Sequence, residues 1–187
     1  MFIVLGLGNP GREYQSTRHN VGFMTLDILA DRYNIDVCRS NFRSVFGEGR
    51  IGAERVVLAK PDTFMNNSGW AARDLVNWYK CENSELIVIY DDIDIPIGTL
   101  RIREGGSSGT HNGMRNIVAE LGREDFARVR VGFKGEGNVP LINYVLSGIP
   151  EADLPLFAET VHAAGLAAAD FARGVPLDNV MQKYNKK

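Results

Sequence analysis

The first twenty residues constrain the fold of this chain more than any other stretch. Residues 2–5 are apolar and have the length of a short buried strand, which ends in the glycine-rich segment 6–11. Polar residues follow as far as His19 and Asn20, where a helical pattern begins. In α/β proteins the loops at the carboxyl ends of strands carry the chemistry. We therefore expect an α/β fold whose first strand brings Asn9 and His19 to a functional site.

The segment GLGNPG at residues 6–11 also matches the dinucleotide-binding pattern G-x-G-x-x-G. That pattern works when a helix begins within it and directs its N-terminus at a pyrophosphate. Here residues 12–18 lack an apolar period, and the helix begins only near Asn20. The sequence therefore disfavours a nicotinamide cofactor. An ordinary turn role for Asn9 stays open, because asparagine tolerates left-handed backbone conformations.

The rest of the chain alternates strand and helix patterns without a linker or an internal repeat. Strands are expected at residues 46–60 (two, joined at 52–54), 86–90, 98–103 and 126–133, and helices after residues 20, 66 and 112 and over 151–171. Asn66, Asn67 and Ser68 are candidate N-caps of one helix, and Asn112 is the expected N-cap of another. This order predicts a single domain over residues 1–187, with a mostly parallel, mixed and twisted sheet sandwiched between helices.

Three acidic residues, Asp91, Asp92 and Asp94, follow the central strand predicted at 86–90. They are consistent with a metal site or with one catalytic acid among solvated neighbours. The three histidines are scattered along the sequence, which disfavours a metal. One acid that orients His19 is the more economical interpretation, and the residue pattern leaves open which of the three it is.

A basic region follows, surrounding a glycine-rich segment at residues 105–110 that we call the flap. Residues 101–134 contain seven Lys or Arg against four Asp or Glu, a local charge of +3 in a chain whose net charge is −2. Such a region is either an ordinary solvated face or a surface that contacts phosphates. Arg115 lies in the first turn of a predicted helix, where a cation opposes the helix dipole, and this favours another task for it.

Composition narrows the class further. Cys38 and Cys81 are far apart and outside any metal-ligand spacing, as in a reduced, cytoplasmic protein. No apolar segment approaches the roughly 18 residues of a membrane span, and the start lacks the pattern of a signal peptide. The expected protein is a cytoplasmic monomer that does not bind membranes.

Four separated blocks resemble bacterial peptidyl-tRNA hydrolases across nearly the whole chain. The blocks are GLGNPG with Tyr14 and RHNVG, then KPDTFMNNSG, then YDDIDIPIG, then the GG…HNGMRN turn. The resemblance implies a single α/β domain that hydrolyses the ester between a peptide and tRNA, with no metal and no cofactor. The chain departs from the family in the flap and at Tyr90, where relatives often carry histidine. A non-catalytic RNA-binding relative of the same fold remains the alternative.

The resemblance also implies roles for individual residues. His19 matches the general base that activates water, Asp91 the acid that steadies it, and Asn9 the residue that distinguishes peptidyl from free aminoacyl esters. The matched substrate positions contact the tRNA end or its peptide (Tyr14, Phe64, Met65, Asn66, Asn112) or lie near tRNA phosphates (Arg103, Arg115, Arg130). A histidine base and amide donors suit an attack by water on an ester. No Ser or Cys sits in a nucleophile elbow, the sharp strand-to-helix turn that exposes a reactive side chain, and this favours water over an acyl-enzyme.

Overall fold

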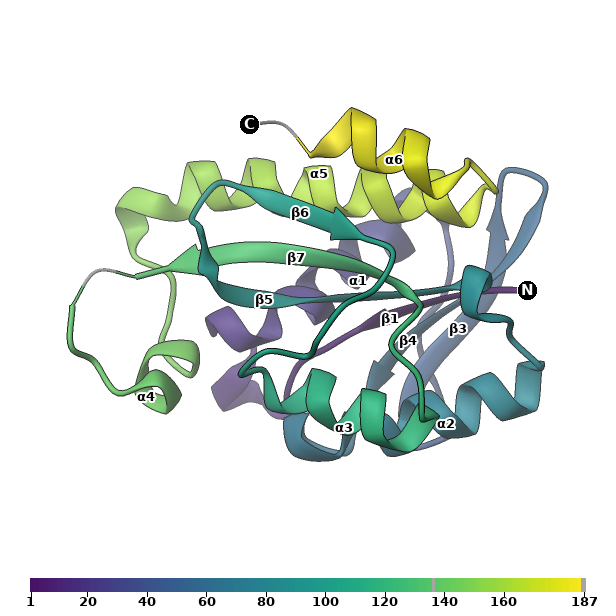
Figure 1. Ribbon diagram of the computed structural model, residues 1–187, viewed down its shortest axis with the longest axis horizontal. Helices are drawn as coiled ribbons and strands as arrows, with labels where there is room; N and C mark the ends of the chain where they lie inside the picture. Colours follow the sequence, from purple (N-terminus) through teal and green to yellow (C-terminus); the bar gives the residue numbers. More distant parts are fainter. Residues whose placement is uncertain (136, 186–187) are drawn as a thin grey trace.

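The computed structural model describes residues 1–135 and 137–185, and these form one sheet with helices on both faces (Figure 1). Within the described residues the sheet has seven strands in the order β2-β3-β4-β1-β5-β7-β6. The bounds are β1 Phe2–Gly6, β2 Arg39–Asn41, β3 Ser44–Ile51, β4 Glu54–Pro61, β5 Leu86–Pro96, β6 Leu100–Arg103 and β7 Ala127–Lys134. The four central strands β4, β1, β5 and β7 are parallel, and antiparallel strands flank them at both edges. The predicted α/β fold is confirmed.

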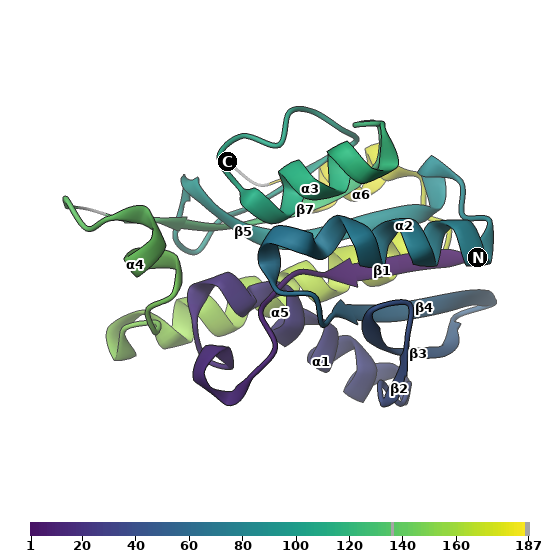
Figure 2. The ribbon, with the colours of Figure 1, turned by 90° about the horizontal axis from the view of Figure 1, so that it is seen from below.

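Helices cover the two faces in two groups, which Figures 1 and 2 show from perpendicular directions. One group packs with α5 and the other pairs α2 with α3. The helices are α1 Val21–Tyr33, α2 Ser68–Tyr79, α3 Asn112–Leu121, α4 Leu141–Val145, α5 Leu154–Ala172 and α6 Leu177–Tyr184, with short 3-10 turns that include η1 Arg12–Tyr14, η2 Arg18–Asn20 and η3 Met65–Asn67. Among the described residues, no helix combines the length and the apolar character that a membrane span requires.

The sheet divides the apolar core in two because successive strand residues face opposite sides. In β1, Val4 packs with α1 and α5, whereas its neighbours Ile3 and Leu5 pack with α2 and α3. The central strands are buried on both faces, as expected for parallel strands. Burial on both faces explains why these strands are continuous apolar runs in the sequence.

A close contact between α1 and the β1 turn fixes the start of the helix. A Cβ on Gly22 would lie 2.2 Å from the Leu7 nitrogen, and one on Gly6 would lie 2.3 Å from the Gly22 carbonyl oxygen. No larger residue fits either position without moving the backbone. Because α1 begins directly against the turn, η2 and its His19 are held next to the carboxyl end of β1.

The structure corrects several element boundaries. β5 continues to Pro96, so Asp91, Asp92 and Asp94 lie within the strand and not beyond its end. The extension pairs with β7 through a register shift between Asp92 and Pro96. The N-cap of α3 is His111, so the prediction of Asn112 as N-cap was wrong. The N-cap of α2 is Asn67, without a side-chain capping bond. β2, α4 and α6 were not predicted.

The outer edge of the sheet is closed by the C-terminal part of the described chain. Asn185 accepts a hydrogen bond from the Ile102 nitrogen (2.6 Å) and donates one to the Ile102 carbonyl oxygen (2.9 Å), as a neighbouring strand would. The buried Asp170 of α5 anchors the same region through ion pairs with Arg173 and Lys183. Ile102 of β6 is therefore hydrogen-bonded to Asn185 on the side of the strand that faces away from β7.

Candidate active site

A cavity of about 670 Å³ lies at the carboxyl ends of the central parallel strands. Ten of the residues singled out from the sequence line it: Asn9, Tyr14, His19, Phe64, Met65, Asn66, Asp91, Arg103, Asn112 and Arg130. Arg115 is not among the described lining residues, and its Nε instead donates to the carbonyl oxygen of Gly109 in the flap (2.9 Å). Segments distant in sequence thus converge on one cavity.

Asn9 is fixed by three hydrogen bonds, and within the described part of the chain these leave its side-chain amide nitrogen without a partner. The Asn20 side chain accepts from the Asn9 nitrogen (2.8 Å) and donates to the Asn9 carbonyl oxygen (2.9 Å). The Asn9 Oδ1 accepts from the Met65 nitrogen (2.7 Å). Because its amide oxygen is occupied, the Asn9 Nδ2 is the part of this side chain that is available to donate to a ligand.

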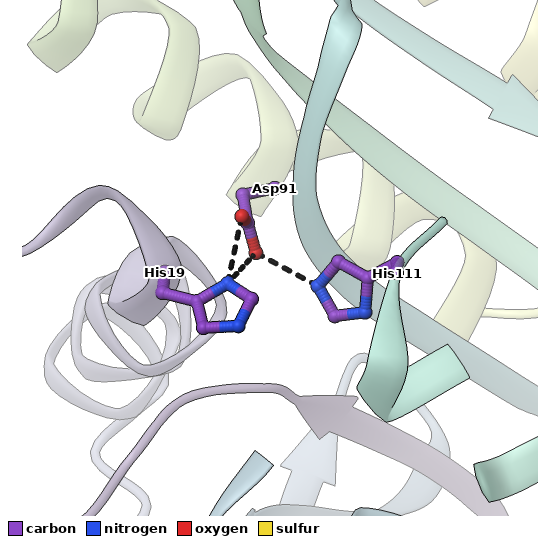
Figure 3. A group of neighbouring side chains, drawn as sticks. All are labelled: His19, Asp91 and His111. Atoms are coloured by element: carbon purple, nitrogen blue, oxygen red, sulfur yellow. Dashed lines mark hydrogen bonds and ion pairs between the residues drawn. The ribbon is translucent and has the colours of Figure 1, made fainter. Parts of the chain in front are cut away.

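His19 and Asp91 form a pair in which the carboxylate orients the imidazole. The His19 Nδ1 lies 2.9 and 2.8 Å from the two carboxylate oxygens of Asp91. Since an ionised carboxylate accepts hydrogen bonds, Nδ1 carries the proton and Nε2 holds the lone pair. Nε2 points away from Asp91 (Figure 3). This is the tautomer that a general base requires.

Asp91 also accepts a second imidazole donor. The His111 Nε2 lies 2.9 Å from Asp91 Oδ1, and Asp91 is 2% exposed. Figure 3 shows the carboxylate between the two imidazoles. Burial alone would favour the neutral acid. The attraction of the His111 imidazole and the hydrogen bonds from His111 and His19 outweigh burial and hold the pKa of Asp91 well below its usual range. Asp91 is thus a permanent acceptor between two histidines.

His111 is a site residue that the sequence analysis missed. Its Nδ1 accepts from the Met114 nitrogen (3.2 Å) and caps α3, so the ring proton resides on Nε2 and is donated to Asp91. Its ring lies 5.0 Å from the rings of both His19 and Tyr90, centroid to centroid. The available signal was its position directly before a helix start. Histidine is not a preferred N-cap residue, and this signal is weak.

The same three residues could hold a metal ion. One donor atom each from His19, Asp91 and His111 lies within 4.8 Å of the others. The sequence argument that the histidines are scattered was therefore wrong for these two. Both imidazole nitrogens that face Asp91 carry protons in its hydrogen bonds. A metal would have to displace both protons, and the absence of a metal stays a prediction.

The remaining acids and bases form the rim of the cavity. Arg130 Nε pairs with Asp92 Oδ2 at 2.7 Å, while Asp94 is exposed and its backbone nitrogen donates to Asp92. Of the three candidate acids, Asp91 is the one that contacts histidine. Arg103 lies on β6 at the exposed side of the cavity.

Exposed apolar side chains also line the cavity. Phe64 is 53% exposed and has φ 59°, a strained value for a residue with a side chain, and its ring meets Tyr14 edge to face with centroids 6.3 Å apart. The unpredicted helix α4 contributes Leu141 and Ile142, which are 43% and 65% exposed. These exposed apolar residues form a surface suited to an apolar ligand group.

Comparison with known proteins identifies the family. The family model "Peptidyl-tRNA hydrolase" matches residues 3–187. The chain belongs to the peptidyl-tRNA hydrolase family. The peptidyl-tRNA hydrolase of Alkaliphilus oremlandii is 46% identical over 99% of this chain and 100% of its own length, and that of Alkaliphilus metalliredigens is 45% identical with the same coverage. A crystal structure of peptidyl-tRNA hydrolase from Acinetobacter baumannii matches with a TM-score of 0.93 at 31% identity, covering 99% of this chain and 94% of that chain.

Membership of the peptidyl-tRNA hydrolase family confirms the resemblance drawn from the four sequence blocks. The two departures, the flap and Tyr90, both line the cavity. The ring of Tyr90 packs against His111, and burial raises the pKa of its phenol despite the opposing charges of Arg130 and Arg128. Neither departure disturbs the contact between His19 and Asp91.

Proposed function

We propose that this protein hydrolyses the ester bond between a peptide and the terminal ribose of tRNA, with His19 as the general base. The observation that supports the proposal most directly is the oriented pair of His19 and Asp91 beside the free amide nitrogen of Asn9, in one cavity. Family membership supports the same substrate.

In the proposed reaction a water molecule gives a proton to the His19 Nε2, and its oxygen attacks the ester carbonyl carbon. Asp91 keeps the Nδ1 proton in place and stabilises the imidazolium that forms. The C–O bond of the ester then breaks, and the ribose oxygen takes the proton back from Nε2. The products are a peptide carboxylic acid, which loses its remaining proton to solvent, and a tRNA with a free terminal hydroxyl. A positioned histidine base contributes roughly 10²–10⁴-fold to such a step.

Asn9 has the role of donor to the substrate in this proposal. Its Nδ2 remains available because Oδ1 accepts from Met65. A donor placed at the ester carbonyl stabilises the negative charge that develops on that oxygen. Asn66 also lines the cavity and, being exposed, offers a second amide.

The two sides of the cavity suit the two parts of the substrate. The apolar surface of Phe64, Leu141 and Ile142 would contact the peptide or the terminal base, with Tyr14, Met65 and Asn112 beside them. Arg103 and Arg130 on the rim would contact phosphates near the acceptor end, so binding weakens as salt rises. Arg115 is assigned to phosphate by resemblance, and its bond to the flap makes this role secondary.

The proposal includes a cytoplasmic monomer that acts without a cofactor. A single cavity contains the proposed base, acid and amide donor, all supplied by one chain. Light scattering during size-exclusion chromatography, at micromolar protein and with the mass compared to 20.7 kDa, tests the monomeric state.

The deciding experiment is release of N-acetyl-aminoacyl groups from charged tRNA by the wild type, His19→Ala and Asn9→Ala. His162→Ala is the matched control, because His162 is an exposed histidine on α5. We expect turnover by the wild type and the control, and losses of about 10²-fold or more in kcat for His19→Ala. Full activity of His19→Ala would disprove the mechanism.

The same experiment separates the enzyme from a non-catalytic RNA-binding relative. Such a relative would bind tRNA without releasing the acyl group, and His19→Ala would leave binding unchanged. Binding without turnover by the wild type would therefore favour the alternative.

A further inference from the structure

Arg128, in the middle of β7, is a charged residue buried in the sheet at 1% exposure. Removing a guanidinium from water is unfavourable unless its donors are satisfied. The side chain is the largest in the group of fully buried residues, and it lines the cavity together with the flap. Neither the proposed reaction nor the proposed phosphate contacts give it a role.

The two terminal nitrogens of Arg128 donate to backbone carbonyl groups in two different loops. Nη1 donates to the oxygen of Ser107 in the flap (2.9 Å), and Nη2 donates to the oxygen of Glu124 before β7 (2.9 Å). The guanidinium carbon lies 4.7 Å from the centre of the Phe126 ring. One rigid, planar group thus connects the flap to the loop between α3 and β7.

Among the residues that the structure describes, the flap has few other contacts that could hold it. Residues 105–110 include no apolar side chain, and a Cβ on Gly106 or Gly109 would meet nothing within 4 Å. Apart from Arg128, the flap carbonyls accept from Arg115 at Gly109 (2.9 Å) and from the His111 nitrogen at Ser108 (3.3 Å). Because little surface is buried, side-chain hydrogen bonds to carbonyls determine the position of the flap.

Gly105 shows independently that the flap is seated against the Glu124 loop. A Cβ built on Gly105 would lie 2.8 Å from the Glu124 carbonyl oxygen, which is the second acceptor of Arg128. The flap can reach this place only with glycine at this position. The Glu124 carbonyl oxygen therefore accepts the Arg128 hydrogen bond and also lies against the backbone of Gly105.

We propose that Arg128 is a positioning residue that holds the flap as a preformed wall of the cavity. The proposal rests on the proposed function, because the wall would meet the acceptor end of the tRNA substrate. A binding wall that is ordered in advance lowers the entropy lost on binding. His19 and Asp91 are carried by η2 and β5 and not by the flap, so loss of Arg128 should affect binding more than the chemical step.

The first test compares Arg128→Met with Arg50→Met, a control in which an exposed arginine also donates to a carbonyl (Ala53). Hydrogen exchange of residues 104–110 and the kinetic constants are measured on the full chain. We expect exchange in the flap to become about tenfold faster and KM to rise about five- to twentyfold in Arg128→Met, with kcat within about threefold. Arg128→Lys has one ammonium in place of the forked guanidinium, so its flap exchange rate and its KM should lie between those of Arg128→Met and the wild type.

The second test leaves Arg128 intact. Gly105→Ala forces the flap away from Glu124, so it should give the same fast exchange and raised KM, and the double variant should be little worse than either single variant. It decides the question by itself if Arg128→Met does not fold. Unchanged flap exchange in both variants, or a loss confined to kcat, would overturn the proposal. Absence of turnover by the wild type would refute the proposed function, while the exchange rates would still test the flap.

Discussion

Two asparagines in this protein make the same pair of hydrogen bonds in two different parts of the fold. Asn20 bonds to the nitrogen and carbonyl oxygen of Asn9 (2.8 and 2.9 Å), and Asn185 bonds to the same two groups of Ile102 (2.6 and 2.9 Å). The first lies at the carboxyl end of the central strand β1. The second lies at the outer edge of β6.

The two pairs differ in what the clamped residue does with its side chain. Asn9 directs its amide into the cavity that contains His19, whereas Ile102 buries its side chain in the core. The Asn20 bonds therefore fix an amide that is proposed to donate a hydrogen bond to the substrate, and the Asn185 bonds complete a sheet edge. An identical local interaction supports function in one place and architecture in the other.

The largest effect on kcat is expected at Asp91. Asp91→Asn should lower kcat by on the order of 10³-fold, because the amide can place an NH₂ donor where Oδ2 accepts from the His19 Nδ1 and no longer selects the tautomer of His19. Single-turnover release of N-acetyl-aminoacyl groups from tRNA measures the chemical step directly. A kcat within tenfold of the wild type would show that Asp91 does not orient the base.

The next effect tests the comparison itself. Asn20→Ala leaves the Asn9 backbone unpaired and its side chain less fixed, so kcat should fall about 10–100-fold and the free energy of unfolding by about 1–3 kcal/mol. Asn185→Ala is the matched control, with a similar loss of stability and an unchanged kcat. Urea unfolding and steady-state kinetics on both variants provide the two measurements. Equal kcat values in the two variants would show that the Asn20 bonds matter no more for activity than the Asn185 bonds.

A smaller effect is expected for Arg103, which lies on the outer strand β6 yet lines the cavity. Arg103→Ala should raise KM by about three- to tenfold with kcat nearly unchanged, because a phosphate contact contributes to binding rather than to the chemical step. The slope of KM against salt concentration should also become shallower. A lower kcat at constant KM would exclude Arg103 from phosphate binding.

The smallest effect is expected for the pH dependence of stability at Asp170, near the outer edge of the sheet. Burial favours the neutral form of Asp170, but its bonds to Lys183, Tyr184 and Arg173 prevail and lower its pKa. A carboxylate whose pKa is lowered on folding stabilises the fold above its ordinary pKa, and this stabilisation is lost as the pH falls toward the folded value. The wild type should therefore exceed Asp170→Asn in stability at pH 7, and urea unfolding should show the gap narrowing below about pH 4. A gap that widens in acid would contradict this assignment.

Sequence reasoning recovered the elements whose burial is regular. The apolar run at residues 86–90 is buried on both faces of the sheet, and the helix expected after residue 112 buries one face against the core. The resemblance to the family named ten further site residues, and these do line one cavity.

The features that the sequence could not show depend on contacts between distant segments. β5 extends to Pro96 because β7 continues to pair with it, and polar residues in that extension resemble a loop. The contact of His111 with Asp91 joins residues that have no shared local pattern. Helix α6 has Val180 as its fully buried residue and begins after Pro176, which resembles a stop signal.

The Asn185 contact has a consequence for how the chain folds. It joins residues 83 positions apart, whereas Asn20 and Asn9 are 11 apart. Distant contacts close larger loops and form later. We therefore expect the turn that carries Asn9 to order before the outer edge of β6 is covered. Since such edges pair with other chains, the docking of the last helix determines how long a newly made molecule is prone to aggregate.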